Sequence, residues 1–296
     1  MINGILVVNH FLKIDKFNEL YHWIEKSAYE LDIELSVLSN RELMFDSMNN
    51  KLKDKKVDFI LFWDKDILLA KHLENLGYRV FNSAKSIEYC DDKALMHVML
   101  AKEGIVCPRT FIPPFNFIDD VDPDDKEIKE YLDDIIKTLG YPFVIKGRKG
   151  SFGAQVHLIR NRIDMYNVLD KYKLNDIIFQ EYIQSSHGRD MRLQVVGENV
   201  VASMFRFSDT DFRANVSNGG RMKSIEPSEE AKNMAIYATK ALGLDFAGVD
   251  ILFGENDKPI LCEVNSNAHF INLYEATKIN VADYIIKHIK ESILNK

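Results

Sequence analysis

Two acidic residues interrupt a pair of strongly apolar segments near the C-terminal end of the chain. Asp250 lies within residues 247–253, and Glu263 lies within residues 259–264. Charged side chains in such segments are costly to bury unless they are paired or bind a cation. The polar residues 254–258 separate the two segments, so the sequence predicts two antiparallel strands joined by a tight turn.

The predicted pairing places the two carboxylates opposite each other. A turn centred between Asn256 and Asp257 sets Asp250 across from Glu263. Their repulsion would cost roughly 4 kcal/mol at about 4 Å and an effective dielectric near 20, and a divalent cation would reverse its sign. Asn265 lies two residues beyond Glu263 and shares its face. Two carboxylates and an amide oxygen suit Mg²⁺, and the alternative is one protonated acid beside a salt-bridged one.

The first third of the chain alternates apolar strands with amphipathic helices. Strands are expected over residues 4–8, 33–38, 59–63 and 79–81, and helices over residues 15–31 and 66–76. A further helix is expected between residues 38 and 59. This alternation predicts a parallel sheet with helices on its faces.

The rest of the chain changes to closely spaced short strands. They are expected over residues 143–146, 155–159, 177–181, 190–196, 199–207, 246–253 and 259–264, with helices over residues 92–103, 126–139 and 162–172. Ser228 caps a further helix that ends at Gly243, and an amphipathic helix closes the chain. The fold class is therefore α/β, and a length of 296 residues suggests two or three packed units.

A glycine-rich turn follows a lysine at the end of an apolar strand. Lys146 ends this strand, and Gly147, Gly150 and Gly153 come directly after it. Backbone N–H groups in such a turn can approach phosphate oxygens, although an ordinary hairpin turn explains the glycines equally well. The spacing fits neither a Walker A loop nor a dinucleotide-binding fingerprint. Lys93, taken alone, is expected to face solvent.

Charge and composition exclude several classes of protein. The net charge of −7 argues against a general nucleic-acid binder, which needs a basic face. A local concentration of Arg206, Arg213, Asn215 and Arg221 is either an anion site or a solvated surface. The cysteines lack the spacing of a disulfide framework or a metal site, so reduced thiols are expected. Without a signal peptide or a bilayer-spanning apolar run, we expect a cytoplasmic protein.

Several ordered stretches together resemble the ATP-grasp superfamily, and most closely its RimK-like branch of glutamate ligases. The resemblance covers residues 90–295 and rests on residues 91–94, 180–183, 188–192 with 211–215, and 247–250 with 263–265. It implies an ATP-grasp fold preceded by a small parallel-sheet αβ domain. The implied division is an N-terminal αβ domain over residues 1–88, a central subdomain with a glycine-rich lid over residues 89–180, and a C-terminal subdomain with the metal site over residues 181–296.

The same resemblance implies a role for each candidate site residue. ATP would be bound by Lys93, Lys146, Gly150, Ser151, Phe152, Gly153, Glu181, Tyr182, Ile183, Asp190, Arg213 and Asn215. Within this set the two lysines and the loop over residues 150–153 would contact phosphates. Glu181 and Tyr182 would meet the adenine, and Asp190 would lie by the ribose. Arg213 and Asn215 would reach the phosphate end. Mg²⁺ would be bound by Asp250, Glu263 and Asn265, in agreement with the strand pairing. Arg192, Arg213 and Arg221 are the candidates for stabilising the oxyanion of the reaction intermediate.

The implied reaction is the ATP-dependent ligation of a carboxylate to an amine through an acyl-phosphate. An amino acid such as glutamate would be added to a small molecule or to a protein or peptide terminus. One or two Mg²⁺ ions would assist, with Mn²⁺ as a substitute. The partners are these two substrates, without nucleic acid or membrane, and a homo-oligomer is compatible with the sequence. Two alternatives share the nucleotide-binding residues: a kinase that phosphorylates a hydroxyl, and a non-catalytic ATP-binding regulator.

The sequence departs from the family pattern directly after Asn265. Family members commonly continue with a small residue and then Pro-Gly, whereas residues 266–270 here read Ser-Asn-Ala-His-Phe. This loop is expected to face the amino substrate. His269 is a candidate contact, and the alternative is a histidine that packs or faces solvent.

Overall fold

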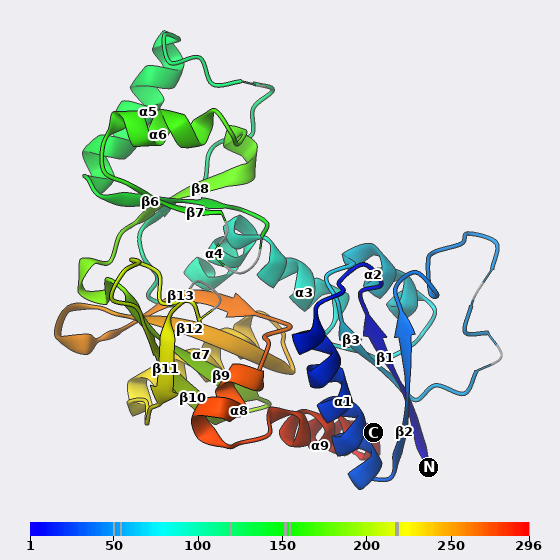
Figure 1. Cartoon of the computed structure of the whole chain (residues 1–296). Coiled ribbons are helices and arrows are strands. Elements are labelled where there is room, and N and C mark those ends of the chain that lie inside the picture. The colour runs from blue at the N-terminus through cyan, green and yellow to red at the C-terminus, as the bar shows by residue number, and fades with distance from the viewer. Residues whose placement is uncertain are drawn as a thin grey trace.

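The computed structural model describes residues 1–49, 51–53, 55–118, 120–150, 153, 155–216 and 219–295. The described chain forms three sheets with helices packed against them. Figure 1 shows the second sheet, with β6 and β8, standing above the other two. Serine 151 and phenylalanine 152, both predicted to contact ATP, lie outside the described residues.

The N-terminal sheet is parallel, as predicted. Its strands are β1 (Ile2–Val8), β2 (Ile33–Ser39), β3 (Phe59–Trp63) and β4 (Val80–Phe81), in the order β2-β1-β3-β4. All residues of β3 are buried, as expected of a strand covered on both faces. The covering helices include α1 (Asp15–Glu30) and α2 (Ile67–Asn75).

The helix expected between β2 and β3 is wrong for the described residues there, which form turns. The Asp46 carboxylate accepts a hydrogen bond from the backbone N–H of Met48 at 3.0 Å. The Glu42 carboxylate likewise binds back to the backbone N–H of Ser39 at 2.8 Å. Such local bonds give the backbone an alternative to helical hydrogen bonding.

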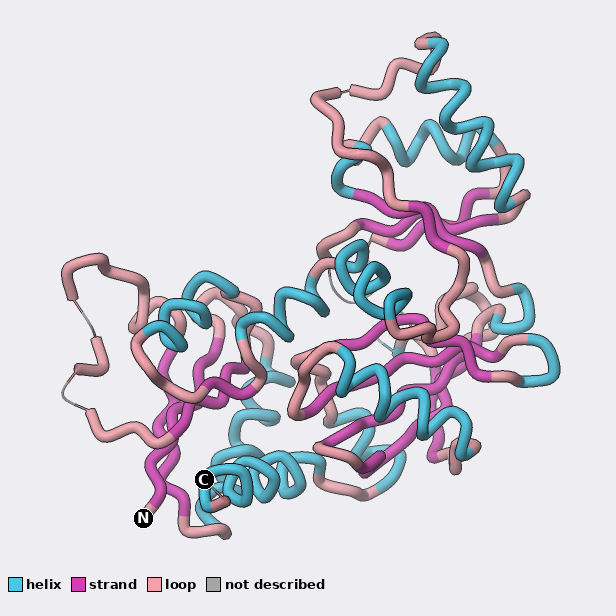
Figure 2. Tube along the Cα trace, turned by 180° about the vertical axis from the view of Figure 1, so that it is seen from behind, coloured by secondary structure: helices cyan, strands magenta, loops and turns pink. Residues whose placement is uncertain are grey.

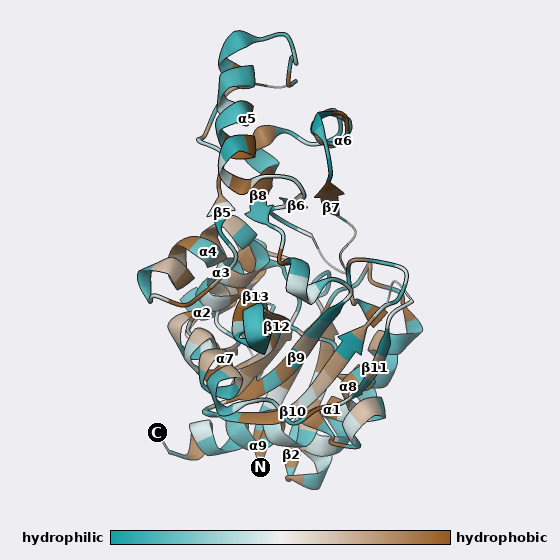
Figure 3. Ribbon diagram, turned by 90° about the vertical axis from the view of Figure 1, so that its left-hand side faces the viewer, coloured by the Kyte–Doolittle hydropathy of each residue, from teal (hydrophilic) through white to brown (hydrophobic). Residues whose placement is uncertain are grey.

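The second sheet is antiparallel and is covered on one face by two helices. Its strands are β5 (Thr110–Phe111), β6 (Phe143–Gly147), β7 (Val156–Ile159) and β8 (Ile177–Glu181), in the order β5-β8-β6-β7. Helices α5 (Lys126–Leu139) and α6 (Arg162–Leu169) pack their apolar faces on it in one core. In Figure 3 the outward turns of α5 are hydrophilic.

The third sheet is also antiparallel and carries the predicted hairpin. Its strands are β9 (Arg189–Val196), β10 (Asn199–Phe207), β11 (Arg221–Ser224), β12 (Phe246–Phe253) and β13 (Pro259–Asn265), in the order β11-β10-β9-β12-β13. Helices α4 (Lys93–Lys102) and α7 (Glu229–Ala241) share its core. The sequence did not predict β11, because its residues are mostly exposed and polar rather than alternating.

Three further helices connect the units. Helix α3 (Ala84–Asp91) links the first sheet to α4, and α8 (Ile271–Thr277) follows β13. The closing helix α9 (Val281–Leu294) returns to the N-terminal unit and shares a core with α1 and with β9 and β10. Figure 2 shows this return, with the two termini at the same end of the molecule. None of the helices in the described ranges is both long and apolar enough to cross a membrane.

Candidate functional site

A cavity of about 770 Å³ opens between the three units. This volume is within the roughly 300–1,000 Å³ typical of small-molecule sites. The described residues predicted to bind nucleotide or metal all line it: Lys93, Lys146, Gly150, Gly153, Glu181, Tyr182, Ile183, Asp190, Arg213, Asn215, Asp250, Glu263 and Asn265. The fold therefore brings together residues that are more than 150 positions apart in the sequence.

Lys93 is buried, contrary to the expectation from its local sequence alone. The Asp92 side chain caps helix α4 by accepting hydrogen bonds from the next N–H groups, which fixes Lys93 at its first position. Its side chain points into the cavity, where Nζ lies 3.2 Å from Glu263 Oε1 and 3.3 Å from the carbonyl oxygen of Gly150. Lys93 thus connects the glycine turn to the third sheet.

Lys146 is the second buried lysine of the cavity and ends strand β6. Its ammonium donates to Cys262 Sγ at 3.6 Å, across the cavity on β13. Burial raises the pKa of the Cys262 thiol, so this cysteine stays protonated near neutral pH. Arg213 approaches from the other side and donates to the carbonyl oxygen of Gly153 at 2.7 Å. Two cations therefore bind the described ends of the glycine turn: Lys93 at Gly150 and Arg213 at Gly153.

The predicted register of the hairpin is confirmed, because Asp250 pairs with Glu263. The expected repulsion between them is nevertheless compensated by the surrounding side chains. Arg192 binds Asp250 with two hydrogen bonds of 2.7 Å, and Arg206 Nη2 lies 3.2 Å from Asp250 Oδ1. Glu263 is paired with Lys93 instead. Neither a bound cation nor a protonated acid is needed to explain this pair.

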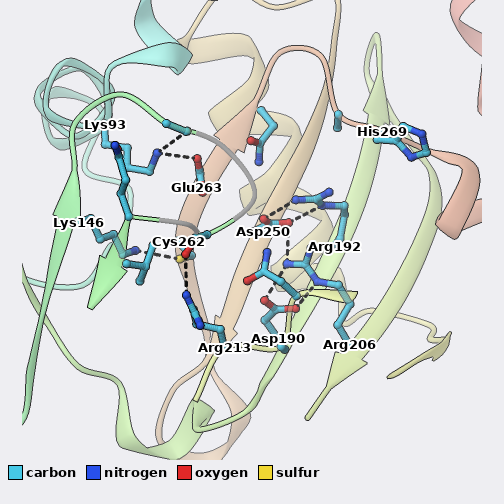
Figure 4. A pocket seen from close by; sticks show the side chains of 18 of the residues that line it. Lys93, Lys146, Asp190, Arg192, Arg206, Arg213, Asp250, Cys262, Glu263 and His269 are labelled. Atoms are coloured by element: carbon cyan, nitrogen blue, oxygen red, sulfur yellow. Dashed lines mark hydrogen bonds and ion pairs between the residues drawn. The ribbon is translucent and has the colours of Figure 1, made fainter. Parts of the chain in front are cut away.

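Asp190 and Arg206 extend the ion-pair network across β9 and β10. Arg206 binds Asp190 with hydrogen bonds of 2.6 and 2.7 Å, and both side chains are buried. Burial acts to raise the pKa of Asp250, but Arg192 and Arg206 outweigh it and hold that pKa below its ordinary value. Burial raises the pKa of Asp190, against the opposing effect of Arg206. Figure 4 shows the two acids and the two arginines side by side.

The donor set beside this network fits a magnesium ion. Within the described residues, no group of three or more His, Cys, Asp or Glu side chains could hold a metal by itself. Glu263 contacts Lys93 through one oxygen, and Asp250 Oδ2 accepts only from Arg192 among the hydrogen bonds of the described chain. Asn265 lies on the same face as Glu263. Oxygen atoms of Glu263, Asp250 and Asn265 therefore remain as hard donors for a metal ion. Mg²⁺ commonly takes one or two protein carboxylates and completes its shell with phosphate and water.

The end of strand β8 forms another wall of the cavity. Glu181 is tied to the chain before β5, since its carboxylate accepts from the N–H of Arg109 at 3.0 Å. On the core side, Gln180 Nε2 donates to His97 Nε2 at 2.9 Å and to Thr110 Oγ1 at 2.8 Å. Burial, followed by Lys146, lowers the pKa of His97 to about 4, so this imidazole is neutral. His97 carries no recognisable signal in the sequence, because it lies on an otherwise ordinary helix.

Of the three candidate arginines, the structure brings two to the cavity. Arg192 and Arg213 line it, but Arg221 does not. Arg221 is exposed on the edge strand β11, where it pairs with Asp209 and its guanidinium lies 4.6 Å from the centre of the Phe207 ring. The prediction of Arg221 as an oxyanion donor is therefore wrong, because its side chain is exposed on an edge strand and does not line the cavity.

The divergent loop after Asn265 packs against the N-terminal unit. Asn267 Nδ2 donates to the carbonyl oxygen of Asp64 at 2.7 Å, and His269 Nε2 donates to that of Lys16 at 3.0 Å. A side chain at position 248 would overlap Ala268, since a Cβ there would lie 2.3 Å from the alanine Cβ, so Gly248 permits the close approach. Residues 266–269 line the cavity, where a substrate would meet them.

The cavity wall on which this loop packs was not foreseen. It consists of N-terminal residues at or near the carboxyl ends of parallel strands: Asn9, Phe11, Leu12, Lys16, Trp63, Asp64 and Lys65. The signal was present in the sequence, because ligands of open parallel sheets bind at this edge. Asn9 directly follows β1, and Asp64 directly follows β3.

The model of the RimK-like ATP-grasp domain matches residues 90–289. The chain belongs to this family. It is 32% identical over 270 residues to an uncharacterized protein of Mycoplasma pneumoniae, with 90% of this chain and 91% of that protein covered. It is 32% identical over 244 residues to N-acetylaspartylglutamate synthase A of Homo sapiens, with 79% of this chain and 58% of that protein covered. Beta-citrylglutamate synthase B of Homo sapiens is 33% identical over 233 residues, with 75% and 55% covered.

Solved structures give the same fold. The D-alanine–D-alanine ligase of Bacillus anthracis complexed with ATP superposes with a TM-score of 0.73 at 17% identity, covering 100% of this chain and 98% of that one. The predicted α/β ATP-grasp fold and the RimK-like family are thus confirmed. So is the reaction class: this RimK-like chain is an ATP-dependent ligase that forms carbon–nitrogen bonds. The named relatives are ligases or synthases, which favours ligation over the kinase and regulator alternatives.

Proposed function

We propose that this RimK-like ligase activates a carboxylate with MgATP and joins it to the amino group of L-glutamate. The observation that carries the proposal is the position of Lys93, which contacts both the glycine turn at Gly150 and the carboxylate of Glu263. A phosphate placed between the turn and β13 would therefore meet a buried ammonium group and a metal-binding carboxylate together.

ATP would lie along the wall formed by β6, β8 and the glycine turn. The adenine would meet the end of β8 at Glu181, Tyr182 and Ile183, which line the cavity. Lys93 and Lys146 would contact the phosphates, and Arg213 and Asn215 would do so at the phosphate end. Preorganised cations of this kind stabilise the charge that develops during phosphoryl transfer. The ribose role of Asp190 stays a prediction, since Arg206 binds both oxygens of that carboxylate.

The metal site would be formed by Glu263, Asp250 and Asn265. Bound Mg²⁺, as one ion or two and with Mn²⁺ as a substitute, would neutralise the charge on the transferring phosphate. Arg192 holds Asp250 in place through both of its carboxylate oxygens. Arg192 and Arg213 line the cavity and would meet the oxyanion that forms when the amine attacks the acyl-phosphate. A cytoplasmic location and a homo-oligomer stay predictions.

Glutamate is proposed as the amine because it recurs in the names of relatives. Both the N-acetylaspartylglutamate synthase and the beta-citrylglutamate synthase carry it, and they share 32% and 33% identity with this chain. The carboxylate partner differs between those two names. The loop at residues 266–269 and the N-terminal wall on which it packs both line the cavity, and there this chain would select its own substrates.

The test supplies the purified protein with ATP, Mg²⁺, L-glutamate and a pool of small carboxylic acids that includes N-acetyl-L-aspartate and citrate. Phosphate release and an amide product found by mass spectrometry are the expected result. A parallel reaction replaces glutamate with hydroxylamine, which traps an acyl-phosphate as a hydroxamate. ATP consumption that yields only a stable phosphorylated product would overturn the ligase reaction for this chain.

A further inference from the structure

The carboxyl edge of the N-terminal sheet carries a polar pair that no part of the nucleotide or metal site uses. Asn9 and Asp64 follow the adjacent strands β1 and β3, and Asn9 Nδ2 donates to the two oxygens of Asp64 at 3.1 and 3.3 Å. Both residues line the cavity. This is the edge at which open parallel sheets bind their ligands.

Asp64 is a buried carboxylate without a cationic partner. The residue is 7% exposed, and its carboxylate accepts hydrogen bonds from neutral groups: the side chains of Asn9 and Asn40, and the N–H of Lys65 at 2.7 Å. The ammonium of Lys65 pairs with Asp91 at 2.7 Å. Within the described chain no ion pair reaches Asp64, and burial raises its pKa. A carboxylate offers about four acceptor positions, so Asp64 keeps capacity to accept from a ligand beside these contacts.

Positive charges lie beside the same space. The loop at residues 267–269 is fastened to the N-terminal unit by the bonds from Asn267 to Asp64 and from His269 to Lys16. Burial lowers the pKa of His269, and the positive charges of Lys16 and Arg192 lower it further. These two cations therefore lie near the loop, while Asp64 supplies the negative charge. A ligand with one ammonium group and separate carboxylates matches this distribution.

We propose that Asp64 is a specificity-determining residue that binds the ammonium group of the amino-acid substrate. The inference rests on the proposed function, which places L-glutamate in this cavity as the amine. The three N–H donors of an ammonium suit a carboxylate that neutral amides hold in position. A dicarboxylate without the amino group would meet Asp64 with like charge, so the same residue also rejects it.

The experiment compares L-glutamate with glutarate, which keeps both carboxylates and lacks the amino group. Binding of each is measured calorimetrically to the full chain in the presence of Mg²⁺ and a non-hydrolysable ATP analogue. Wild-type protein should bind glutamate at least about 10-fold more tightly than glutarate. Asp64→Asn should lose at least about 10-fold in glutamate affinity, with glutarate binding unchanged or improved.

Asp66→Asn is the matched control, because it removes the same charge two residues away. Asp66 caps α2 by accepting from Leu69 N at 3.0 Å, a role that asparagine also fills. This control should keep the preference for glutamate. Nucleotide affinity and the thermal midpoint, measured for both variants, establish that the fold is intact.

The outcomes separate this inference from the function on which it rests. If wild-type protein prefers glutamate and Asp64→Asn keeps that preference, the role of Asp64 is overturned while glutamate stays the substrate. If wild-type protein binds neither compound, glutamate as the amine is overturned and the inference with it. If Asp64→Asn loses the preference and Asp66→Asn keeps it, the result supports both the role of Asp64 and glutamate as the amine.

Discussion

Asp250 and Glu263 lie directly opposite each other on β12 and β13, yet different cations neutralise them. Asp250 belongs to the buried network of Arg192 and Arg206, whereas Glu263 pairs with Lys93 at 3.2 Å. Substitution of either acid therefore removes a different set of ion pairs. A substitution of Glu263 disturbs the helix that carries Lys93, and a substitution of Asp250 disturbs the centre of the third sheet.

Glu263→Gln should greatly weaken Mg²⁺-dependent ATP turnover without unfolding the protein. Because Lys93 is buried and would lose its ionic partner, the free energy of unfolding without Mg²⁺ should fall by roughly 1–3 kcal/mol. Turnover measured against Mg²⁺ concentration and denaturation by urea provide the two readouts. Glu255→Gln, in the exposed turn before β13, is the control. Wild-type turnover at low Mg²⁺, or a variant more stable than wild type, would contradict the assignment.

The Asp190–Arg206 pair should be the most stability-sensitive ion pair of the third sheet. Arg206→Leu leaves a buried carboxylate without its partner, and the expected loss is roughly 3–5 kcal/mol. Adding Asp190→Asn to this variant should restore part of that loss. Arg221→Leu is the matched control, since its pair with Asp209 is exposed and should contribute about 1 kcal/mol or less. Equal losses for the two arginines in urea denaturation would show that burial does not separate them.

Lys146→Ala should lower the affinity for ATP by about tenfold or more. Lys146 is buried at the cavity end of β6, where a phosphate would replace Cys262 as its partner. Lys149, three residues later, is exposed and gives the matched variant Lys149→Ala. Titration with nucleotide should show a small change for Lys149→Ala. Similar losses in the two variants would mean that the wrong lysine has been assigned to the phosphates.

The register of the β12–β13 hairpin was only partly predictable from the sequence. The register at Asp250 and Glu263 was predicted correctly, although two deviations combine to give it. Next to the turn Phe253 pairs with Pro259, one residue off the predicted register, and Cys262 then enters as an extra residue that restores it. A turn can be centred from polar residues, but an extra residue within a strand leaves no local pattern.

The neutralising arginines could not be predicted from the hairpin alone. Arg192 faces Asp250 because β9 lies beside β12, and Arg206 reaches them because β10 lies beside β9. Both placements depend on the order of strands in the sheet, which the spacing of residues does not encode. Asp64 was missed for a different reason. A single acid after an apolar strand is common, and only the three-dimensional arrangement shows that this one lines the cavity.

Stability should fall in acid because His97 is buried and neutral. Burial lowers its pKa from 6.5 to about 4, so between these values the unfolded chain binds a proton that the folded chain does not. The contribution of His97 is fully present above the unfolded pKa and is lost as the pH falls through the folded one, with a limit of about 3 kcal/mol. His97→Gln should therefore lose less stability than wild type between about pH 7 and about pH 5 in urea denaturation. His22→Gln, at an exposed position, should follow wild type. A pH dependence in His97→Gln as steep as that of wild type would show that other groups, not His97, control the acid sensitivity of the fold.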